Sequence, residues 1–341
     1  MKAIRIDKPG DIGLVEVEKP KIANSREILI RVVCGSICGS DLGIFKGTNS
    51  VATYPIVIGH EFGGVVEEIG SEVTGIRPGD LVAVDPVRSC GHCYACRHGR
   101  QNVCAGVKCV GVHMPGGFSE FVTVPAERAN KVDPERISPE LVCLIEPYSI
   151  GVQVNTRGRI AKGDLVLVMG CGPAGLCIIQ DARARGAVVL ASDIIDARLE
   201  AALKMGAAAA VNVKKEDIRK AAADFSRGEG MPVVVDAACT VDSFPLALDL
   251  ASPGGRAVIM GLGAAVSQVP AVAVTRKELD VIGSRLNNHR FEEVIAGMER
   301  GIYAPEFLRS HVFPLAEAVK AFDLALNHPE EVRKVVLKFD A

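Results

Sequence analysis

The sequence of 341 residues contains no tryptophan, and aromatic residues make up only 4% of it. It has no apolar run of signal-peptide length near its start, and no stretch approaches the roughly 18 apolar residues that a membrane span needs. Its formal net charge is −2, so neither sign of charge is in large excess. Such a chain offers no broad attraction for nucleic acid or an anionic membrane surface. We therefore expect a globular cytoplasmic protein that binds neither nucleic acid nor membranes.

Cysteine, by contrast, is abundant, and its count of 11 is odd. Because thiols stay reduced in the cytoplasm, clustered cysteines favour a metal site over disulfides. Four of them follow the spacing C-x2-C-x2-C-x7-C and are Cys90, Cys93, Cys96 and Cys104. Four thiolates can close the tetrahedral shell of a structural zinc ion, which leaves no position for a substrate.

An iron–sulfur cluster is the main metal alternative, because the spacing of the first three cysteines also begins the ferredoxin run. That run continues with a fourth cysteine after three residues and then a proline. In this chain the gap is seven residues, and Ala105 follows the fourth cysteine. We therefore favour zinc, held in a lobe at about residues 88–106.

The distribution of apolar residues divides the chain into two parts. Residues 1–150 contain short apolar runs separated by glycine and proline turns, which predicts an all-β, barrel-like unit. From residue 151 to residue 285, apolar strands alternate with helix-like segments, a pattern typical of a parallel sheet covered on both faces. Residues 286–341 again mix helix and strand. We predict an α/β protein with two domains.

The segment GCGPAG, from Gly170 to Gly175, fits the pattern G-x-G-x-x-G, follows an apolar strand and opens a helix. In that setting Gly170 permits a tight turn, Gly172 lets the backbone approach a pyrophosphate, and Gly175 allows close helix–strand packing. Pro173 and Ala174 fall on the first helical turn, whose N–H groups and dipole favour phosphate. The motif predicts a dinucleotide-binding site.

Asp193 ends the next strand, 18 residues after Gly175. A carboxylate there can accept hydrogen bonds from both adenosine ribose hydroxyls and would repel a 2′-phosphate, which favours NAD over NADP. Its alternative role is to cap the following helix. Arg198 either flanks the adenine or is a solvated surface residue. Gly261 and Gly263, after a later strand, either lie against the nicotinamide or form a turn without ligand contact.

Two other segments contain residue types that suit a catalytic metal. GSICGSD contains Cys38, and VIGHEFGG contains the adjacent His60 and Glu61. One thiolate, one imidazole and one carboxylate form the mixed, incomplete shell expected of catalytic rather than structural zinc. Further along, Glu146 precedes a proline in LIEPYSIG. Each residue alone has an ordinary structural explanation, and their combination with the other motifs predicts a second zinc.

The segments CGSD, GHEFGG and GCGPAG, the four-cysteine cluster and EP at 146–147 together resemble the zinc-dependent medium-chain dehydrogenases. This family includes alcohol, sorbitol and threonine dehydrogenases, and the resemblance spans nearly the whole chain. It implies a GroES-like β-barrel catalytic domain formed by residues 1–150 and 286–341. It implies a Rossmann domain, a doubly wound parallel sheet that binds NAD, at residues 151–285. It also implies two zinc ions per chain, one catalytic and one structural, and a homodimer or homotetramer.

The resemblance also implies roles for individual residues. Cys38 and His60 would be ligands of the catalytic zinc, and Glu61 looks like the third ligand in the sorbitol-dehydrogenase branch. Glu146 stands where alcohol dehydrogenases use a second cysteine, and it would bind the metal directly or through water. Asp41 would orient His60 from behind, the usual role of a carboxylate beside a ligating imidazole.

Ser40 is implied as the group that first accepts the proton of the substrate hydroxyl. Related dehydrogenases often carry a histidine two residues after the aspartate of this segment, but Gly43 stands there in this chain. The histidine relay is therefore absent or supplied from elsewhere. Two other functions stay open: a zinc-free enzyme of the quinone-reductase type, and a non-catalytic protein that senses NAD or redox state.

Two segments bear on the substrate, since residues 111–121 and 283–288 resemble those of the galactonate and gulonate 5-dehydrogenases. Arg285 would then lie beside the nicotinamide and pair with a substrate carboxylate through its two-pronged donor geometry. A structural salt bridge is its alternative role. His113 and Asn287 are further candidates for substrate contact. A sugar acid is thus the expected substrate, with polyols such as sorbitol and the amino acid threonine as alternatives.

Overall fold

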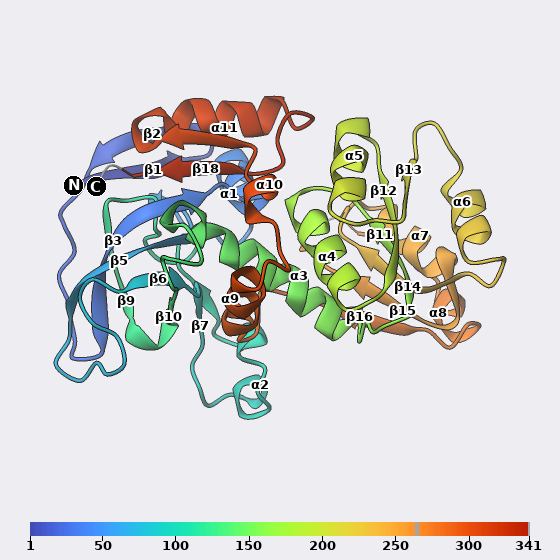
Figure 1. Ribbon diagram of the computed structural model, residues 1–341, viewed down its shortest axis with the longest axis horizontal. Coiled ribbons are helices and arrows are strands. Elements are labelled where there is room, and N and C mark those ends of the chain that lie inside the picture. Colours follow the sequence, from blue (N-terminus) through green and yellow to red (C-terminus); the bar gives the residue numbers. More distant parts are fainter. Residues whose placement is uncertain (263–265, 340–341) are drawn as a thin grey trace. The chain divides into compact units, whose positions relative to one another are not determined.

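The computed structural model describes residues 1–262 and 266–339 (Figure 1). The chain divides into two compact units, one formed by residues 1–146 and 287–341 and the other by residues 147–286. The first unit is mainly antiparallel sheet and the second contains a six-stranded parallel sheet, so the expected α/β fold class is confirmed. In the described part of the chain, no helix combines the length and the apolar character needed to cross a bilayer.

The first unit contains most of the strands. Its strands are β1 (Lys2–Lys8), β2 (Asp11–Glu16), β3 (Glu27–Ser36), β4 (Ile56–Val57), β5 (Phe62–Ile69), β6 (Leu81–Val84), β7 (Val87–Arg88), β8 (Lys108–Cys109), β9 (Phe121–Pro125), β10 (Ala129–Lys131), β17 (His311–Pro314) and β18 (Val335–Lys338). Its helices and 3-10 turns are α1 (Gly39–Lys46), α2 (Tyr94–Arg97), η1 (Gln101–Val103), η2 (Ala126–Arg128), η3 (Pro139–Leu144), α9 (Phe291–Glu299), α10 (Pro305–Leu308), η4 (Leu315–Glu317) and α11 (Ala318–Asn327).

Strand β3 is the centre of the first unit. It pairs with β5 along one edge, and β9 and β18 share its other edge, all antiparallel. Because side chains alternate along a strand, Ile28, Ile30 and Val32 point into the same buried core cluster. The pairing of β18 with β3 sets Val336 opposite Ser36 and so joins the end of the chain to its beginning.

The second unit alternates strands with helices, and α3 (Ile145–Arg157) runs into it from the first. Its strands are β11 (Leu165–Met169), β12 (Val188–Asp193), β13 (Ala209–Asn212), β14 (Met231–Asp236), β15 (Ala251–Ile259) and β16 (Asp280–Gly283). Its helices are α4 (Pro173–Ala184), α5 (Asp196–Lys204), α6 (Ile218–Phe225), α7 (Ser243–Leu250) and α8 (Val272–Thr275).

These strands form one parallel sheet in the order β13-β12-β11-β14-β15-β16, the Rossmann order in which the first strand lies at the centre. Leu167 of β11 belongs to a buried cluster with residues of α6 and α7, whereas its neighbour Val168 faces α4. Both faces of the sheet are therefore covered. The run predicted as a strand over 232–239 ends at Asp236, because Cys239 is left-handed (φ 56°) and donates its N–H to that carboxylate.

Candidate active site

Three of the predicted metal ligands come together in the first unit. Strand β3 ends at Ser36, and two residues later Cys38 stands at the start of α1. His60 and Glu61 directly precede β5, the antiparallel partner of β3. The donor atoms of Cys38, His60 and Glu61 all lie within 4.8 Å of one another. The pairing of two strands thus forms a compact set of one sulfur, one nitrogen and one oxygen donor.

Asp41 supports two of these donors from behind. It is fully buried, and its Oδ2 accepts the backbone N–H of Cys38 at 2.8 Å. Its Oδ1 lies 3.3 Å from Nδ1 of His60, so Nε2 is the ring atom left for a metal. The hydroxyl of Ser40 lies 3.3 Å from that Nε2. The position behind His60 is the one expected for Asp41, and its bond to the Cys38 backbone is an additional finding.

The charges around His60 act on its basicity. Burial lowers the pKa of His60, but the nearby Asp41 and Cys38 raise it by more, so that it stands well above its ordinary value. The metal-free site therefore favours the imidazolium form. A metal must displace that proton, which couples metal binding to pH.

Glu61 is held by partners from two other segments. Lys334, just before β18, places its Nζ 2.7 Å from Oε1 and 2.6 Å from Oε2 of Glu61. The hydroxyl of Ser36 donates to Oε2 of the same carboxylate. The side chains of Glu61 and Lys334 are each only 2% exposed. Burial lowers the pKa of Lys334, but Glu61 and Cys38 raise it by more, so Lys334 stays charged.

Glu146 is the second carboxylate of this region. It lies in the first turn of α3 and is 4% exposed. Burial, reinforced by the charge of Glu61, raises the pKa of Glu146 to about 8, while His60 and Lys334 act in the opposite direction. Without a metal, this carboxyl is therefore largely protonated at neutral pH.

The donor set fits a catalytic zinc ion. Thiolate, imidazole and carboxylate are the ligands that zinc takes in catalytic sites, and three protein donors leave one position open. Two buried atoms, Nδ1 of His60 and Oδ1 of Asp41, have no hydrogen-bond partner of good geometry among the described residues. A ligand on Nε2 would fix the imidazole and direct its Nδ1–H toward the carboxylate.

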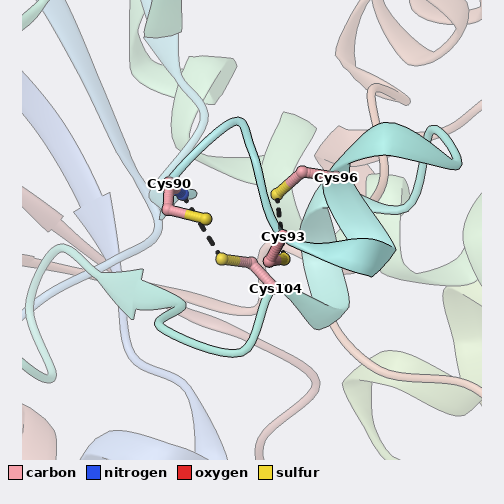
Figure 2. Close-up of side chains that lie close together, drawn as sticks. All are labelled: Cys90, Cys93, Cys96 and Cys104. Carbon is pink, nitrogen blue, oxygen red and sulfur yellow. Dashed lines mark hydrogen bonds between the residues drawn. The ribbon is translucent and has the colours of Figure 1, made fainter.

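Figure 2 shows the four-cysteine lobe, in which the sulfurs of Cys90, Cys93, Cys96 and Cys104 gather around one point. Their Sγ atoms all lie within 4.8 Å of one another. Cys93 stands at the start of α2 and Cys96 within it, and their sulfurs are 3.5 Å apart. Backbone N–H groups lower the pKa of Cys93 to about 6, which favours its thiolate. The four soft donors fit a closed, tetrahedral zinc site.

The glycine motif forms the turn from β11 into α4. Gly170 is left-handed (φ 96°), and a Cβ on Gly175 would lie 2.0 Å from the carbonyl oxygen of Gly170. Nothing lies within 4 Å of the place that a Cβ of Gly172 would take. Gly172 precedes α4, which begins at Pro173 and Ala174, and supplies no side chain to cap it. The first N–H groups of this helix are thus left for an anion, as a pyrophosphate site requires.

Asp193 lies at the end of β12 and is 7% exposed. Its Oδ2 accepts the N–H of Cys171 at 2.7 Å, which ties the carboxylate to the glycine turn. Its Oδ1 accepts the N–H groups of Ile194 at 2.7 Å and Ile195 at 3.0 Å. Ile195 occupies the N-cap position of α5 and makes no side-chain capping bond, so Asp193 lies two residues before that position. The acid is therefore held beside the motif, as a ribose-binding residue would be.

Two of the predicted substrate contacts already have partners within the first unit. Nδ1 of His113 accepts the backbone N–H of Cys109 at 3.0 Å. Asn287 is 1% exposed and donates to Oδ1 of Asp85 at 3.1 Å. Their contact with a substrate stays a prediction, and for Asn287 the burial gives it a structural role as well.

The remaining predicted residues lie in the second unit. Arg198 of α5 places its Nη1 3.9 Å from Oδ2 of Asp193. Gly261 follows β15, and a Cβ there would lie 3.6 Å from Cβ of Cys239. Arg285 follows β16. Gly263 lies outside the described residues.

Lys334 and Ser36 are the residues of this site that sequence reasoning missed. A lysine directly before the apolar run VVL is a weak signal of a buried charge, since lysine is rarely buried unless it is paired. No sequence pattern could name its partner Glu61, which lies 273 residues away. Ser36, at the end of an apolar strand, gives no signal.

Comparison with known proteins agrees with the fold and the donor sets. Residues 24–134 match the family described as alcohol dehydrogenase GroES-like domain, and residues 173–300 match the zinc-binding dehydrogenase family. The chain is 40% identical over 341 residues to the starvation-sensing protein RspB of Escherichia coli K12, covering 99% of each. It is 31% identical to the L-threonine 3-dehydrogenase of Paraburkholderia phytofirmans over the whole of both chains.

A crystal structure of the RspB protein from Escherichia coli CFT073, described as a short chain alcohol dehydrogenase complexed with the cofactor NADH, superposes with a TM-score of 0.94. It shares 39% sequence identity over 99% of both chains. The fold and the comparisons define an oxidoreductase of alcohol groups. This chain belongs to the zinc-dependent medium-chain dehydrogenase family.

Proposed function

We propose that this protein is an NAD-dependent zinc dehydrogenase that reversibly oxidises a secondary alcohol of a sugar acid to the ketone. The observation that carries the reaction class is the convergence of Cys38, His60 and Glu61, whose donor atoms lie within 4.8 Å of one another. Such a mixed, three-donor set leaves a position for substrate, whereas the four-cysteine lobe does not. Catalysis is therefore assigned to the former and a structural role to the latter.

The residues of the first unit have separate tasks in this proposal. Cys38 and His60 hold the zinc, Glu61 or Glu146 supplies the carboxylate, and Asp41 keeps the imidazole in one orientation. Bound zinc would polarise the substrate hydroxyl and lower its pKa, and bound NAD would accept the hydride.

Ser40 is the proposed first acceptor of the substrate proton. Its hydroxyl lies 3.3 Å from Nε2 of His60, the ring atom assigned to the metal, so it stands beside the position where the substrate oxygen is activated. A hydroxyl can accept one proton while it donates its own onward. With Gly43 in place of a histidine, the proton leaves through Ser40 to the cofactor ribose or water.

NAD is proposed over NADP because of Asp193. Three backbone N–H groups donate to its carboxylate and hold it in place. A fixed negative charge at the end of β12 accepts hydrogen bonds from ribose hydroxyls and repels a 2′-phosphate. The related RspB structure contains NADH, which supports the same choice. Arg198, whose Nη1 lies 3.9 Å from Oδ2 of Asp193, is proposed to flank the adenine.

The sugar-acid substrate rests on the segments at 111–121 and 283–288, with Arg285 as the proposed partner of the substrate carboxylate. L-Threonine is the second candidate, because threonine 3-dehydrogenases match the chain along its whole length. Both substrates carry a carboxylate and a secondary hydroxyl, but one carbon separates the two groups in threonine and three carbons separate the carboxylate from C5 of an aldonate. Their carboxylates would therefore lie at different distances from the reacting hydroxyl. The assembly implied by the family resemblance is a homodimer or homotetramer.

The test is NAD reduction by the purified zinc enzyme across aldonates, polyols and threonine. We expect turnover with an aldonate such as gulonate or galactonate, at least tenfold above sorbitol and threonine in kcat/KM. Faster oxidation of threonine or sorbitol would refute the sugar-acid assignment but keep the reaction class. Elemental analysis should give two zinc ions per chain. The Cys38→Ser variant should still bind NAD but lose turnover. If neither the wild-type protein nor this variant turns over any substrate while both bind NAD, a sensor is indicated instead.

A further inference from the structure

Lys334 brings a positive charge into the catalytic site. Its ammonium contacts both oxygens of Glu61, at 2.7 and 2.6 Å, and its side chain is 2% exposed. Strand β18 carries it there by pairing with β3, which ends at Ser36, the other donor to Glu61. A lysine is rarely buried so completely unless it is paired with a negative charge.

The charges that surround Lys334 are those of the proposed metal site. Cys38 and Glu146, as well as Glu61, act electrostatically on the ammonium. A divalent ion next to one thiolate and three buried carboxylates, Asp41 among them, would leave negative charge in excess in a buried site. The ammonium of Lys334 reduces that excess by one charge. Its position at Glu61 also makes it a competitor with the metal for the same carboxylate.

We propose that Lys334 is a positioning residue of the catalytic centre, which limits how strongly Glu61 and the site as a whole hold the zinc. This inference rests on the proposed function, since it takes Cys38, His60 and Glu61 as the zinc site. Because Lys334 forms an ion pair with Glu61, it weakens the bond that this carboxylate makes to the metal. By its charge, it keeps the metal electron-poor enough to polarise a hydroxyl.

Removal of Lys334 should change the zinc affinity in the direction opposite to that expected for a residue that supports the site. Removal of an ordinary supporting residue weakens metal binding, whereas removal of a cation beside a divalent ion removes a repulsion and strengthens it. Replacing Lys334 with an uncharged residue should therefore tighten the catalytic zinc and at the same time slow turnover. A merely structural lysine would give weaker zinc binding and slower turnover together.

The experiment uses the full-length enzyme with two uncharged variants, Lys334→Gln and Lys334→Met. Glutamine keeps a donor for Glu61 and so protects folding, while methionine removes both donor and charge. The matched control is Lys338→Met, which removes the lysine at the far end of β18; it is 52% exposed and pairs with Glu140 at the surface. Zinc content is measured at buffered free zinc at pH 8, and cobalt(II) replaces zinc for visible spectroscopy.

We expect half-occupancy of the catalytic site at about tenfold lower free zinc in both Lys334 variants, with kcat reduced about tenfold or more. The cobalt d–d bands should weaken because Glu61, released from Lys334, can bind the metal through both oxygens and so raise the coordination number. Lys338→Met should match the wild-type enzyme in zinc affinity, kcat and cobalt spectrum. Weaker or unchanged zinc binding in Lys334→Gln, with an unchanged cobalt spectrum, would overturn the inference. If the wild-type enzyme itself binds only one zinc ion or lacks NAD-linked turnover, the proposed function is refuted instead.

Discussion

Asp41 gives the sharpest test of how the catalytic site is organised. The isosteric change Asp41→Asn keeps an oxygen to accept the N–H of Cys38, which is now 2.8 Å away, and so leaves the start of α1 intact. It removes the negative charge that lies 3.3 Å from Nδ1 of His60. The substitution thus isolates one interaction, the one that orients and polarises the imidazole.

The expected magnitude follows from that single contact. A hydrogen bond to a charged group contributes about 1.5–3 kcal/mol, and it is lost because the amide, whose oxygen stays with Cys38, places a second donor opposite Nδ1–H of His60. Since about 1.4 kcal/mol is a factor of ten, zinc affinity at the catalytic site should fall about 10- to 100-fold. The structural zinc in the four-cysteine lobe should be unaffected, because none of its ligands contacts Asp41.

The assay is zinc occupancy against a graded chelator, with the first and second equivalents resolved. Asp7→Asn is the control, because Asp7 belongs to the same unit and pairs with Arg5 at the surface. Thermal unfolding of the metal-free proteins checks that both variants fold. If Asp41→Asn holds both zinc ions as tightly as the unchanged protein, then Asp41 does not orient a metal-bound His60 and the assigned geometry is wrong.

Three further predictions address the rest of the molecule. Cys96→Ser should lower the zinc content from two ions to one and open the lobe to trypsin, while Cys239→Ser, at an exposed cysteine, should do neither. Asp193→Asn should reduce the preference for NAD over NADP in kcat/KM about tenfold, since the charge that repels a 2′-phosphate is removed; an unchanged ratio would exclude Asp193 from cofactor choice. In the metal-free protein, the pKa of Glu146 is raised to about 8 from 4.5, so the folded state holds a proton that the unfolded state releases. Its stability should therefore fall as the pH rises from about 4.5 to 8, and Glu146→Gln should flatten that part of a thermal-unfolding profile.

Where the candidate residues lie within a short segment, the sequence alone indicates how they are arranged in space. Cys90, Cys93, Cys96 and Cys104 lie within one loop, so their spacing nearly determines that their sulfurs can meet. The glycine motif is likewise local, because a strand, a tight turn and a helix follow one another along the chain. Its predicted geometry, with φ 96° at the first glycine, is present in the structure. The alternation of strands and helices also predicted the parallel sheet.

The catalytic site depends on contacts that no local pattern specifies. The sequence named Cys38, His60 and Glu61 as candidates, but only the pairing of β3 with β5 brings their donor atoms within 4.8 Å. Asp85 and Asn287 meet across 202 residues, and Glu61 and Lys334 across 273.

The sequence by itself thus determined the family, the dinucleotide turn, the structural metal lobe and the list of candidate ligands. Those features arise from residue types at short, fixed spacings, which backbone geometry converts directly into structure. Only the tertiary structure decided which charges surround the catalytic donors. The pairing of β18 with β3 delivers the ammonium of Lys334 to Glu61. Strand pairing between distant segments is set by the burial of a whole sheet, and no single motif records it.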